Sequence, residues 1–341
     1  MHLPVIESAR PGTRPAATGA VLVVASALAL ALDGPVARAA YQHGLDPAAF
    51  GFWRACVGAL VLGGFLAIRP RPGLLAAIRR LHRAAVLRLA LAALAGLGLN
   101  LALFQAFARL PVAVAVAAFG CYPLLVAAWE AACRPHRTGA IGPGHGVGLA
   151  AVAIIGLFLL TRPDPSVPVP VAGLLLALLA AVLHAAYIVL GRGGWGEAGD
   201  GAATFLIVAT AAAGLGVLAA VTSPQAALAP VTDPGLATLL LLEGVLAGAV
   251  APLLFLAGLR RIGATRTAVL SLAEPLAATL LAAVVLRQLP GPSQLAGAAL
   301  LVGAGIAVQA RPPYRRRRAP RAGVRDTEGL SPRPEVSAAQ P

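Results

Sequence analysis

The sequence contains no lysine, and charged residues of every kind are scarce. Asp, Glu, Lys and Arg make up 12% of its 341 residues, whereas soluble proteins contain about 25%. Hydrophobic residues account for 59%, with a mean hydropathy of +0.83. Regular alternation of apolar and polar residues is also lacking, which disfavours a transmembrane β-barrel. The composition therefore excludes an ordinary soluble domain and indicates helices that cross a bilayer of about 30 Å.

The motifs of enzymes and cofactor sites are missing as well. Cys56, Cys121 and Cys133 lie in or beside apolar segments without the spacing of metal ligands, so we interpret them as packing residues. The glycine-rich stretch 142–148 has no preceding strand and no lysine, so it does not fit a phosphate-binding loop. We expect no metal, no cofactor and no catalytic centre.

All basic residues are arginines, and together with the few acids they give a net charge of +14. They lie in loops and in the C-terminal tail, without the fold signatures of nucleic-acid-binding proteins. We therefore expect no nucleic-acid partner. The sequence leaves the oligomeric state open.

Ten apolar segments of helix length follow one another along the chain, separated by polar clusters and prolines. This pattern predicts an all-α membrane protein with ten transmembrane helices. We place the segments at residues 17–37, 48–68, 85–107, 111–132, 141–161, 171–190, 202–222, 236–258, 264–286 and 291–310.

The unequal distribution of arginine over the loops predicts the orientation. With the N-terminus inside, most loop arginines fall on the inner side, including the cluster at 69–88, Arg260 and Arg261. By the positive-inside rule, we expect a multi-pass protein of the inner cell membrane with both termini in the cytoplasm. Residues 37–39 resemble a signal-peptide cleavage site, but cleavage would remove the first helix, so we expect this segment to be retained.

The two halves of the chain share a pattern. Pro123 follows Arg109, and Pro275 follows Arg261, in both cases 14 positions later and within apolar sequence. A repeat at half the chain length indicates duplication, and five helices per half force opposite orientations. We therefore expect two inverted five-helix repeats. We set the domains as a cytoplasmic N-terminal tail (1–16), a first repeat (17–138), a second repeat (139–310) and a basic, disordered cytoplasmic tail (311–341).

Two basic regions are predicted to contact lipid. Residues 74–84 form a basic amphipathic stretch, and the tail contains four consecutive arginines at 315–318. Anionic lipid at the inner membrane face attracts such sequences. Between the halves, the proline-rich stretch 163–170 should form a stiff, extended spacer.

Several ionisable residues fall inside the apolar segments, where each costs roughly 2.5–3.5 kcal/mol unless it pairs or faces water. Asp33 is a candidate to bind a cationic group or a proton, or to pair with a nearby arginine. Arg54 can hold an anionic substrate group or serve as the partner of Asp33. Glu274 lies deep within its segment and is a candidate for contact with a substrate or a coupling ion.

Three polar residues complete the predicted binding site. His184 occupies the position of the second half that corresponds to Asp33, and an Asp–His pair can relay protons. The alternative for His184 is a packing role. Asn100 and Tyr187 can donate hydrogen bonds in a central cavity, or pack between helices.

Glycine and proline mark four candidate hinges. Gly34 and Pro35 interrupt the first segment, and Pro123 and Pro275 occupy equivalent places in the two halves. Proline frees a backbone carbonyl and bends a helix, so these positions can line the cavity. Structural kinks without ligand contact are the alternative.

Two further acids receive a different interpretation. Glu130 and Glu243 lie near the predicted ends of their segments, so we expect their side chains to reach the membrane interface. Gly244 and Gly248 are spaced four apart, which permits close helix packing.

In their order and spacing, these motifs resemble the EamA-type permeases of the drug/metabolite transporter superfamily. The chain departs from the family pattern at Asp33-Gly34-Pro35, where members commonly have a large residue before the glycine, and at 133–135 and 286–288, where they have a Gly-Glu pair. The matching stretches are Asn100–Pro111, Tyr122–Ala127, Gly244–Phe255, Arg260–Arg266, Glu274–Ala278 and Gln294–Gly305.

The resemblance implies ten helices in two inverted repeats and a secondary transporter that works by alternating access. It further implies small metabolites such as amino acids as substrates, and export as the direction. Proton coupling is a possible energy source, since no ATPase motif is present. The alternatives are a membrane receptor or assembly protein without transport, and a lipid-modifying enzyme, which would need a clustered nucleophile or metal set.

Overall fold

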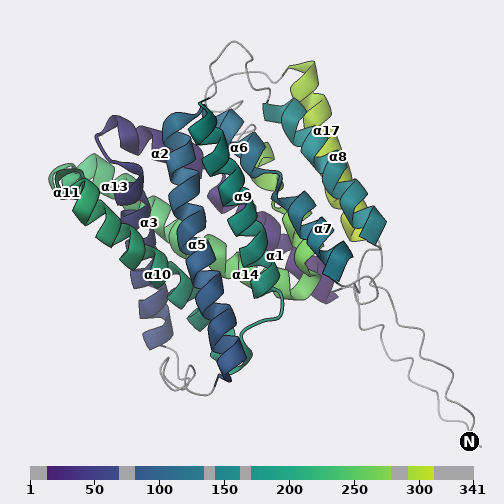
Figure 1. Cartoon of the computed structure of the whole chain (residues 1–341), viewed down its shortest axis with the longest axis horizontal. Helices are drawn as coiled ribbons and strands as arrows, with labels where there is room; N and C mark the ends of the chain where they lie inside the picture. The colour runs from purple at the N-terminus through teal and green to yellow at the C-terminus, as the bar shows by residue number, and fades with distance from the viewer. Residues whose placement is uncertain (1–13, 69–80, 134–142, 162–169, 278–290, 311–341) are drawn as a thin grey trace, which may run out of the picture.

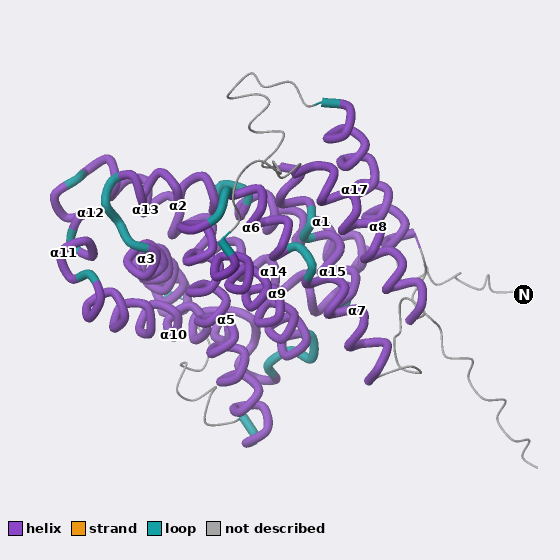
Figure 2. The backbone as a smooth tube through the Cα atoms, turned by 45° about the horizontal axis from the view of Figure 1, so that its top comes forward, coloured by secondary structure: helices purple, strands orange, loops and turns teal. Residues whose placement is uncertain are grey.

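The structure, a computed structural model, describes residues 14–68, 81–133, 143–161, 170–277 and 291–310, and the regular elements in these ranges are helices (Figure 2). Their bounds are α1 (Arg14–Leu30), α2 (Asp33–Gln42), α3 (Pro47–Ala67), α5 (Arg83–Arg109), α6 (Val112–Phe119), α7 (Tyr122–Cys133), α8 (Pro143–Thr161), α9 (Val171–Gly191), η1 (Gly196–Ala198), α10 (Gly199–Thr222), α11 (Pro224–Ala227), α12 (Ala229–Thr232), α13 (Pro234–Glu243), η2 (Gly244–Val250), α14 (Ala251–Ile262), α15 (Ala264–Leu270) and α17 (Pro292–Ala310).

Six of the predicted segments form helices that are long and apolar enough to cross a membrane. These helices are Ala16–Gln42, Pro47–Ala67, Arg83–Arg109, Val171–Gly191, Gly199–Thr222 and Pro234–Ile262. The segments at 111–132, 141–161 and 291–310 contain shorter apolar helices. Of the segment at 264–286, residues 278–286 lie outside the described ranges. The protein is therefore a helical, multi-pass membrane protein with six clear spanning candidates.

Two of the spanning helices begin in the same way. Asp46 precedes Pro47 at the start of α3 and accepts a hydrogen bond from the backbone N–H of Ala49 at 2.6 Å. Asp233 precedes Pro234 at the start of α13 and accepts hydrogen bonds from the N–H groups of the first turn. An aspartate cap satisfies free N–H groups, and proline at the first helical position needs no hydrogen bond. These sequences therefore fix where both helices start.

The helices of the two halves are interleaved (Figure 1). Numbered by segment, α1 packs against α14 (1 with 8) and α5 against α9 (3 with 6). The helix α3 packs against α10 (2 with 7), and α8 against α17 (5 with 10). Segments 1–5 of the first half correspond to segments 6–10 of the second half. If each segment is replaced by its equivalent, the 1–8 contact becomes the 6–3 contact, and the 2–7 and 5–10 contacts remain the same. The packing thus has the pseudo-two-fold relation expected of two repeats.

Helix breaks occur at the predicted hinges. The first span is interrupted at residues 31–32, directly before Asp33 and Gly34. In the first half, residues 120–121 separate α6 from α7 just before Pro123. In the second half, residues 271–272 interrupt the helix shortly before Pro275. The two prolines therefore mark equivalent breaks in the two halves.

Some predictions fall on residues outside the described ranges. They concern the domain boundary at 138/139, the spacer at 163–169, and the tails 1–13 and 311–341. In the predicted surface stretch 74–84, residues 74–80 also lie outside. Residues 83–84, however, belong to the first turn of α5, which His82 caps by accepting a hydrogen bond from the N–H of Ala85 at 3.0 Å. These two residues are exposed at the start of a spanning helix, and lipid contact of the stretch stays a prediction.

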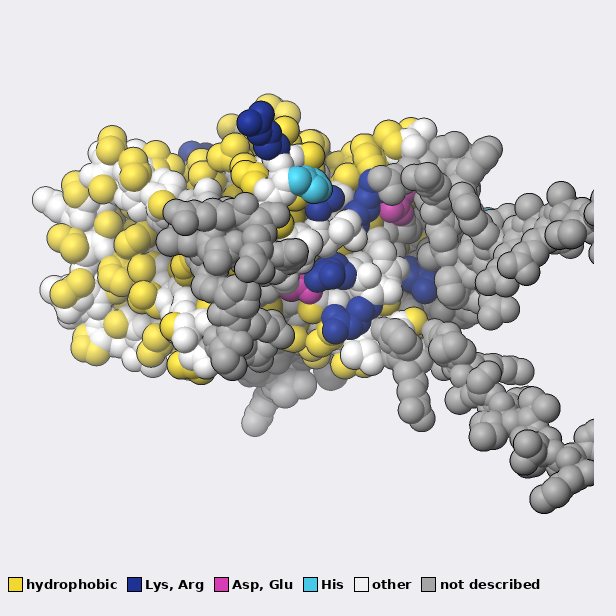
Figure 3. All heavy atoms as spheres, turned by 90° about the horizontal axis from the view of Figure 1, so that it is seen from below, with side chains coloured by type: hydrophobic (Ala, Val, Ile, Leu, Met, Phe, Trp, Pro, Cys, Tyr) yellow, Lys and Arg dark blue, Asp and Glu magenta, His cyan; other side chains and the backbone are white. Residues whose placement is uncertain are grey.

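Arginine side chains gather on one face of the molecule (Figure 3). This face contains the start of α5 and the end of α9. The basic residues at these and the neighbouring helix ends are His82, Arg83, Arg88, Arg192, Arg260 and Arg261. The arginines among them were assigned to the inner side from the loop pattern, and the fold brings them onto a common surface.

Candidate functional site

The residues predicted as binding candidates share one cavity of about 130 Å³. This is roughly ten times the space that a single water molecule needs. Helices from both halves form the walls of the cavity. The six predicted residues that line it are Asp33, Arg54, Asn100, His184, Tyr187 and Glu274.

One side of the cavity, which we call the ionic wall, consists of Asp33, Arg54 and Asn100. The guanidinium of Arg54 lies against Asp33, with Nη2 donating to Oδ2 at 3.0 Å and Nε 3.0 Å from Oδ1. Its Nη1 donates to Oδ1 of Asn100 at 3.1 Å. Asp33 is the first residue of α2, so the break in the first span places its carboxyl group beside α3. Paired and hydrogen-bonded charges of this kind are tolerated inside a membrane.

Glu243 belongs to the same ion cluster, although the sequence placed it at the interface. Its side chain is buried, with Oε1 3.8 Å from Nε of Arg54. This residue ends α13 well inside a 29-residue span rather than at its edge. The interfacial prediction for Glu243 is therefore wrong. One feature of the sequence could have indicated that Glu243 is buried: it directly precedes Gly244 and Gly248, the pair of glycines predicted to allow close helix packing.

Close backbone contact holds this cluster together. The π-helix η2 follows Glu243, and the carbonyl oxygen of Ala247 within it accepts a hydrogen bond from Nη2 of Arg54 at 3.1 Å. Gly248 packs directly on α3, where a Cβ atom would collide with the carbonyl oxygen of Arg54 and lie only 3.3 Å from Cα of Gly58. A glycine is therefore required for η2 to approach α3 this closely.

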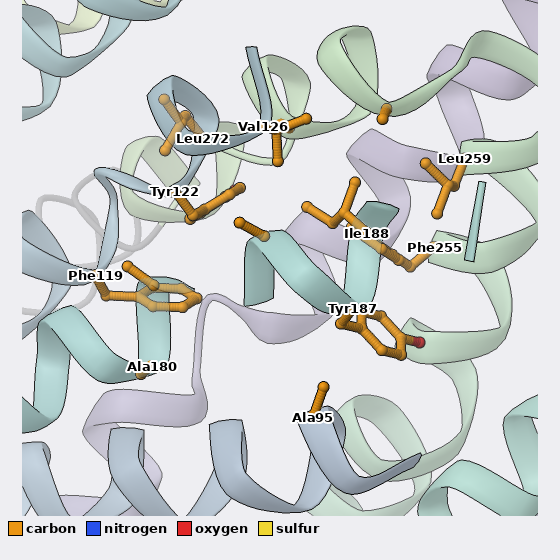
Figure 4. Close-up of a cluster of buried hydrophobic side chains, with 14 of the residues drawn as sticks. Ala95, Phe119, Tyr122, Val126, Ala180, Tyr187, Ile188, Phe255, Leu259 and Leu272 are labelled. Carbon is orange, nitrogen blue, oxygen red and sulfur yellow. The ribbon is translucent and has the colours of Figure 1, made fainter. Parts of the chain in front are cut away.

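Aromatic rings form another part of the cavity lining, which we call the aromatic wall. These rings belong to Phe119, Tyr122, His184, Tyr187 and Phe255. The His184 ring lies 4.5 Å from that of Tyr122 in an edge-to-face contact and 5.6 Å from that of Phe255. Tyr187 stacks on Phe255 at 5.9 Å (Figure 4). Such ring pairs contribute about 0.5–1.5 kcal/mol each beyond their buried area.

His184 does not pair with Asp33. Its Nδ1 is buried without a hydrogen-bond partner among the described residues, whereas Asp33 is occupied by Arg54. The two residues line the same cavity, but no hydrogen bond joins them in the described chain. The packing alternative for His184 therefore agrees better with the geometry than the direct relay does.

The predicted hinges flank the cavity without lining it. Tyr122 and Glu274, directly before the two prolines, line the cavity, whereas Pro123 and Pro275 are buried outside its lining. Gly34 packs on α6, where a Cβ atom would lie 2.7 Å from Val112. Pro35 is exposed. The geometry therefore agrees with the alternative of structural kinks, because the breaks turn the neighbouring side chains Asp33, Tyr122 and Glu274 toward the cavity.

Equivalent positions of the two halves meet in this cavity. Five residues of the first half line the cavity together with the residues that lie 152 positions later in the second half. Asp33 and His184 form a sixth pair, 151 positions apart. The five pairs are Gly96 with Gly248, Asn100 with Pro252, Leu103 with Phe255, Phe119 with Ser271, and Tyr122 with Glu274. The cavity therefore lies where equivalent parts of the two halves meet, and apart from the glycine pair the paired residues are of different types.

Glu130 connects the two halves at the arginine-rich face. Its carboxylate lies 3.6 Å from Nη1 of Arg192 and accepts a hydrogen bond from the hydroxyl of Thr265. The guanidinium of Arg192 also lies over the ring of Trp129, 4.2 Å from its centroid. Glu130 thus pairs with the second half of the chain and does not simply extend into water.

The described residues contain no group of three His, Cys, Asp or Glu side chains placed to hold a metal ion. Cys56 and Cys121 are half-buried, and Cys133 is exposed. The arrangement can instead bind a small molecule with charged and apolar parts, because ionic and aromatic groups face one space.

Comparisons with known proteins agree with this architecture. The model of the EamA-like transporter family matches residues 17–162 and 171–308, so that each matched stretch spans five predicted segments. The boundary set at 138/139 would instead leave four segments in the first repeat and six in the second. A solved structure described only as the crystal structure of a protein has a TM-score of 0.65 at 22% sequence identity, over 87% of this chain and 96% of that chain. This likeness shows a shared fold. No curated protein matches the sequence.

Proposed function

The chain belongs to the EamA-like transporter family, and from this premise we propose that it is a secondary transporter that exports small metabolites, such as amino acids or related compounds, across the inner membrane. The proposal includes alternating access of two inverted five-helix repeats, ten helices in all, with both termini in the cytoplasm. It also includes proton coupling as the energy source and anionic lipid as the partner of the basic stretch 74–84 and the C-terminal tail.

The observation that carries the proposal is the cavity between the two halves. Its walls are contributed by equivalent positions, so a rocking motion of one half against the other would change both sides of the site together. Its ionic wall places charges within spanning helices, where they are retained only when they are paired or functional. An amino group can pair with Asp33 or Glu274, and an apolar side chain can pack on the aromatic rings.

The test compares metabolites in the medium of cells that express the native chain or the double variant Asp33→Asn/Glu274→Gln. Membrane levels must be matched. Asp233→Asn serves as a control, because Asp233 is an acid outside the cavity. We expect one or more amino acids or related compounds to accumulate outside only with the native chain and the control.

Identical profiles for all three proteins would contradict the proposal and favour a receptor or assembly role. Lipid products that change with the native chain, without any exported metabolite, would favour the enzyme alternative.

A further inference from the structure

The ion cluster contains more acid than base. Asp33 and Glu243 share the single guanidinium of Arg54, and both are close to the same atom, Nε, at 3.0 Å and 3.8 Å. With both carboxyl groups ionised, the cluster would carry a net charge of −1 in the interior of the membrane. Burying an unpaired charge is costly enough that such a group takes up a proton or a counter-ion instead.

The two acids differ in how well they are bound. Asp33 receives a hydrogen bond from Arg54 at 3.0 Å and lines the cavity. Glu243 is 3% exposed and does not line the cavity. Its Oε1, like Oδ1 of Asp33, accepts no hydrogen bond from the described residues, but Arg54 donates a hydrogen bond to Asp33 and none to Glu243, whose side chain lies within hydrogen-bonding reach of the Asp33 carboxyl group. An ionised carboxylate needs donors for its oxygens, whereas a neutral acid needs fewer. The extra proton therefore belongs on Glu243 while Arg54 is bound to Asp33.

The surroundings of Arg54 allow it to change partners. Its Nη2 also donates to Ala247 in η2, the π-helix that begins directly after Glu243. The guanidinium is thus attached to the element that carries Glu243 as well as to Asp33. π-Helical turns within α-helices are found mostly at functional sites, where they aim backbone and side chains differently from a regular helix.

We propose that Glu243 is the proton-carrying residue of the transport cycle and that Arg54 exchanges between Asp33 and Glu243. This inference rests on the proposed function. When a cationic group of the substrate enters the cavity and pairs with Asp33, Arg54 moves toward Glu243. Glu243 then releases its proton to water, and the cluster stays neutral, with two carboxylates balanced by Arg54 and the substrate cation.

Departure of the substrate reverses these changes. Glu243 takes up one proton, and Arg54 returns to Asp33. One proton is therefore exchanged for one cationic group. The charged groups that act on Glu243 in the described chain are Asp33, Arg54 and, farther away, Glu274.

The first experiment needs no substrate. Infrared spectra of the full-length protein in lipid nanodiscs at neutral pH detect the carbonyl band of a protonated carboxyl group. We expect Glu243→Gln to remove a band equivalent to one carboxyl group, and Asp233→Asn to leave it unchanged. We also expect Asp33→Asn to remove this band, because Arg54 then pairs with Glu243, which ionises.

These spectra can overturn the inference. A band that survives in Glu243→Gln with full intensity would show that the proton lies elsewhere. A band that survives in Asp33→Asn would show that Arg54 does not change partners. Glutamine copies the neutral acid, so Glu243→Gln should fold at native levels, and this variant alone decides the location of the proton if Asp33→Asn does not fold.

The second experiment separates this inference from the proposed function. Vesicles containing the protein are loaded with a mixture of the protein amino acids and their decarboxylated amines, and efflux is followed by mass spectrometry with and without a pH gradient. A pH gradient should accelerate efflux through the native protein. Glu243→Gln should still exchange compounds across the membrane, but without acceleration by the gradient.

Absence of efflux from the native protein would contradict the proposed function, whatever the spectra show. Gradient-driven efflux by both the native protein and Glu243→Gln would contradict the role of Glu243 and leave the proposed function standing.

Discussion

The ionic wall and the aromatic wall face the same cavity, but they differ in how their parts depend on one another. In the ionic wall, Arg54 bonds to both Asp33 and Asn100, and it also contacts Glu243 and the carbonyl group of Ala247 behind the wall. In the aromatic wall, His184 touches the other four rings, but these contacts are apolar and another ring can replace it, and the pairs Phe119–Tyr122 and Tyr187–Phe255 do not depend on it. A change in the ionic wall should therefore have a concentrated effect, and a change in the aromatic wall a distributed one.

The largest effect is expected for Arg54→Ala. This substitution leaves Asp33 buried without a counter-charge, and breaking a buried ion pair costs roughly 3–5 kcal/mol. We expect export to be lost and the thermal unfolding midpoint of the purified protein in detergent to fall by many degrees. Arg261→Ala is the control, because Arg261 is exposed and bonds only to its own helix in the described chain. Equal midpoints for the two variants would contradict the central position of Arg54.

A second substitution tests the backbone contact beneath the ionic wall. Gly248→Ala places a methyl group against the carbonyl oxygen of Arg54, so α3 and η2 must move apart. Overpacking of this kind costs about 1–3 kcal/mol, and it should also weaken export.

Gly64→Ala is the matched control on α3, because a Cβ atom there meets nothing within 4 Å. Alanine favours a helix over glycine by about 1 kcal/mol, so this control should unfold at the same temperature or higher. Similar losses of stability and export in Gly248→Ala and Gly64→Ala would show that the close contact of Gly248 with α3 is not what the protein depends on.

The aromatic wall should respond more weakly. His184→Phe keeps a ring among Phe119, Tyr122, Tyr187 and Phe255, and it removes a buried nitrogen that has no hydrogen-bond partner among the described residues. We expect the free energy of unfolding to change by less than about 1 kcal/mol. Export should fall less than tenfold, with a changed order of preference among compounds. Complete loss of gradient-driven export would instead restore a proton-relay role for His184.

An exposed ion pair gives the smallest expected effect and contrasts with the buried one. Asp233 lies 3.1 Å from His43, and both side chains are well exposed. The backbone N–H of Leu236 and then the side chain of His43 lower the pKa of Asp233 from 3.8. A lowered pKa stabilises the folded state above the ordinary value, and this contribution disappears as the pH falls through the folded pKa.

The change Asp233→Asn should therefore leave the unfolding midpoint nearly the same at neutral pH, since surface ion pairs contribute little. Any difference from the native chain should vanish in acid, below about pH 3.8. Unfolding scans of both proteins at several pH values provide the measurement. A large loss at neutral pH would mean that this contact is as important as the buried cluster.

Sequence patterns predicted one wall better than the other. Asp33 and Arg54 stand out because charges are rare in apolar segments, and their pairing was among the stated alternatives. Glu243 was misplaced because its distance from the segment end was taken to decide where its side chain goes, and hydropathy cannot show that packing beside Arg54 buries it. Phe119 and Phe255 carried no signal at all, since aromatic residues are ordinary in spanning helices.

By itself, the sequence determined the membrane character, the duplication and the family of this protein. These properties depend on composition and spacing along the chain, which local chemistry makes readable: apolar runs of helix length, proline after arginine in both halves, and arginine-rich loops. The tertiary structure decided which charges meet. Glu243 and Asp33 are 210 positions apart, and only the close packing of η2 on α3 brings both carboxyl groups to one guanidinium.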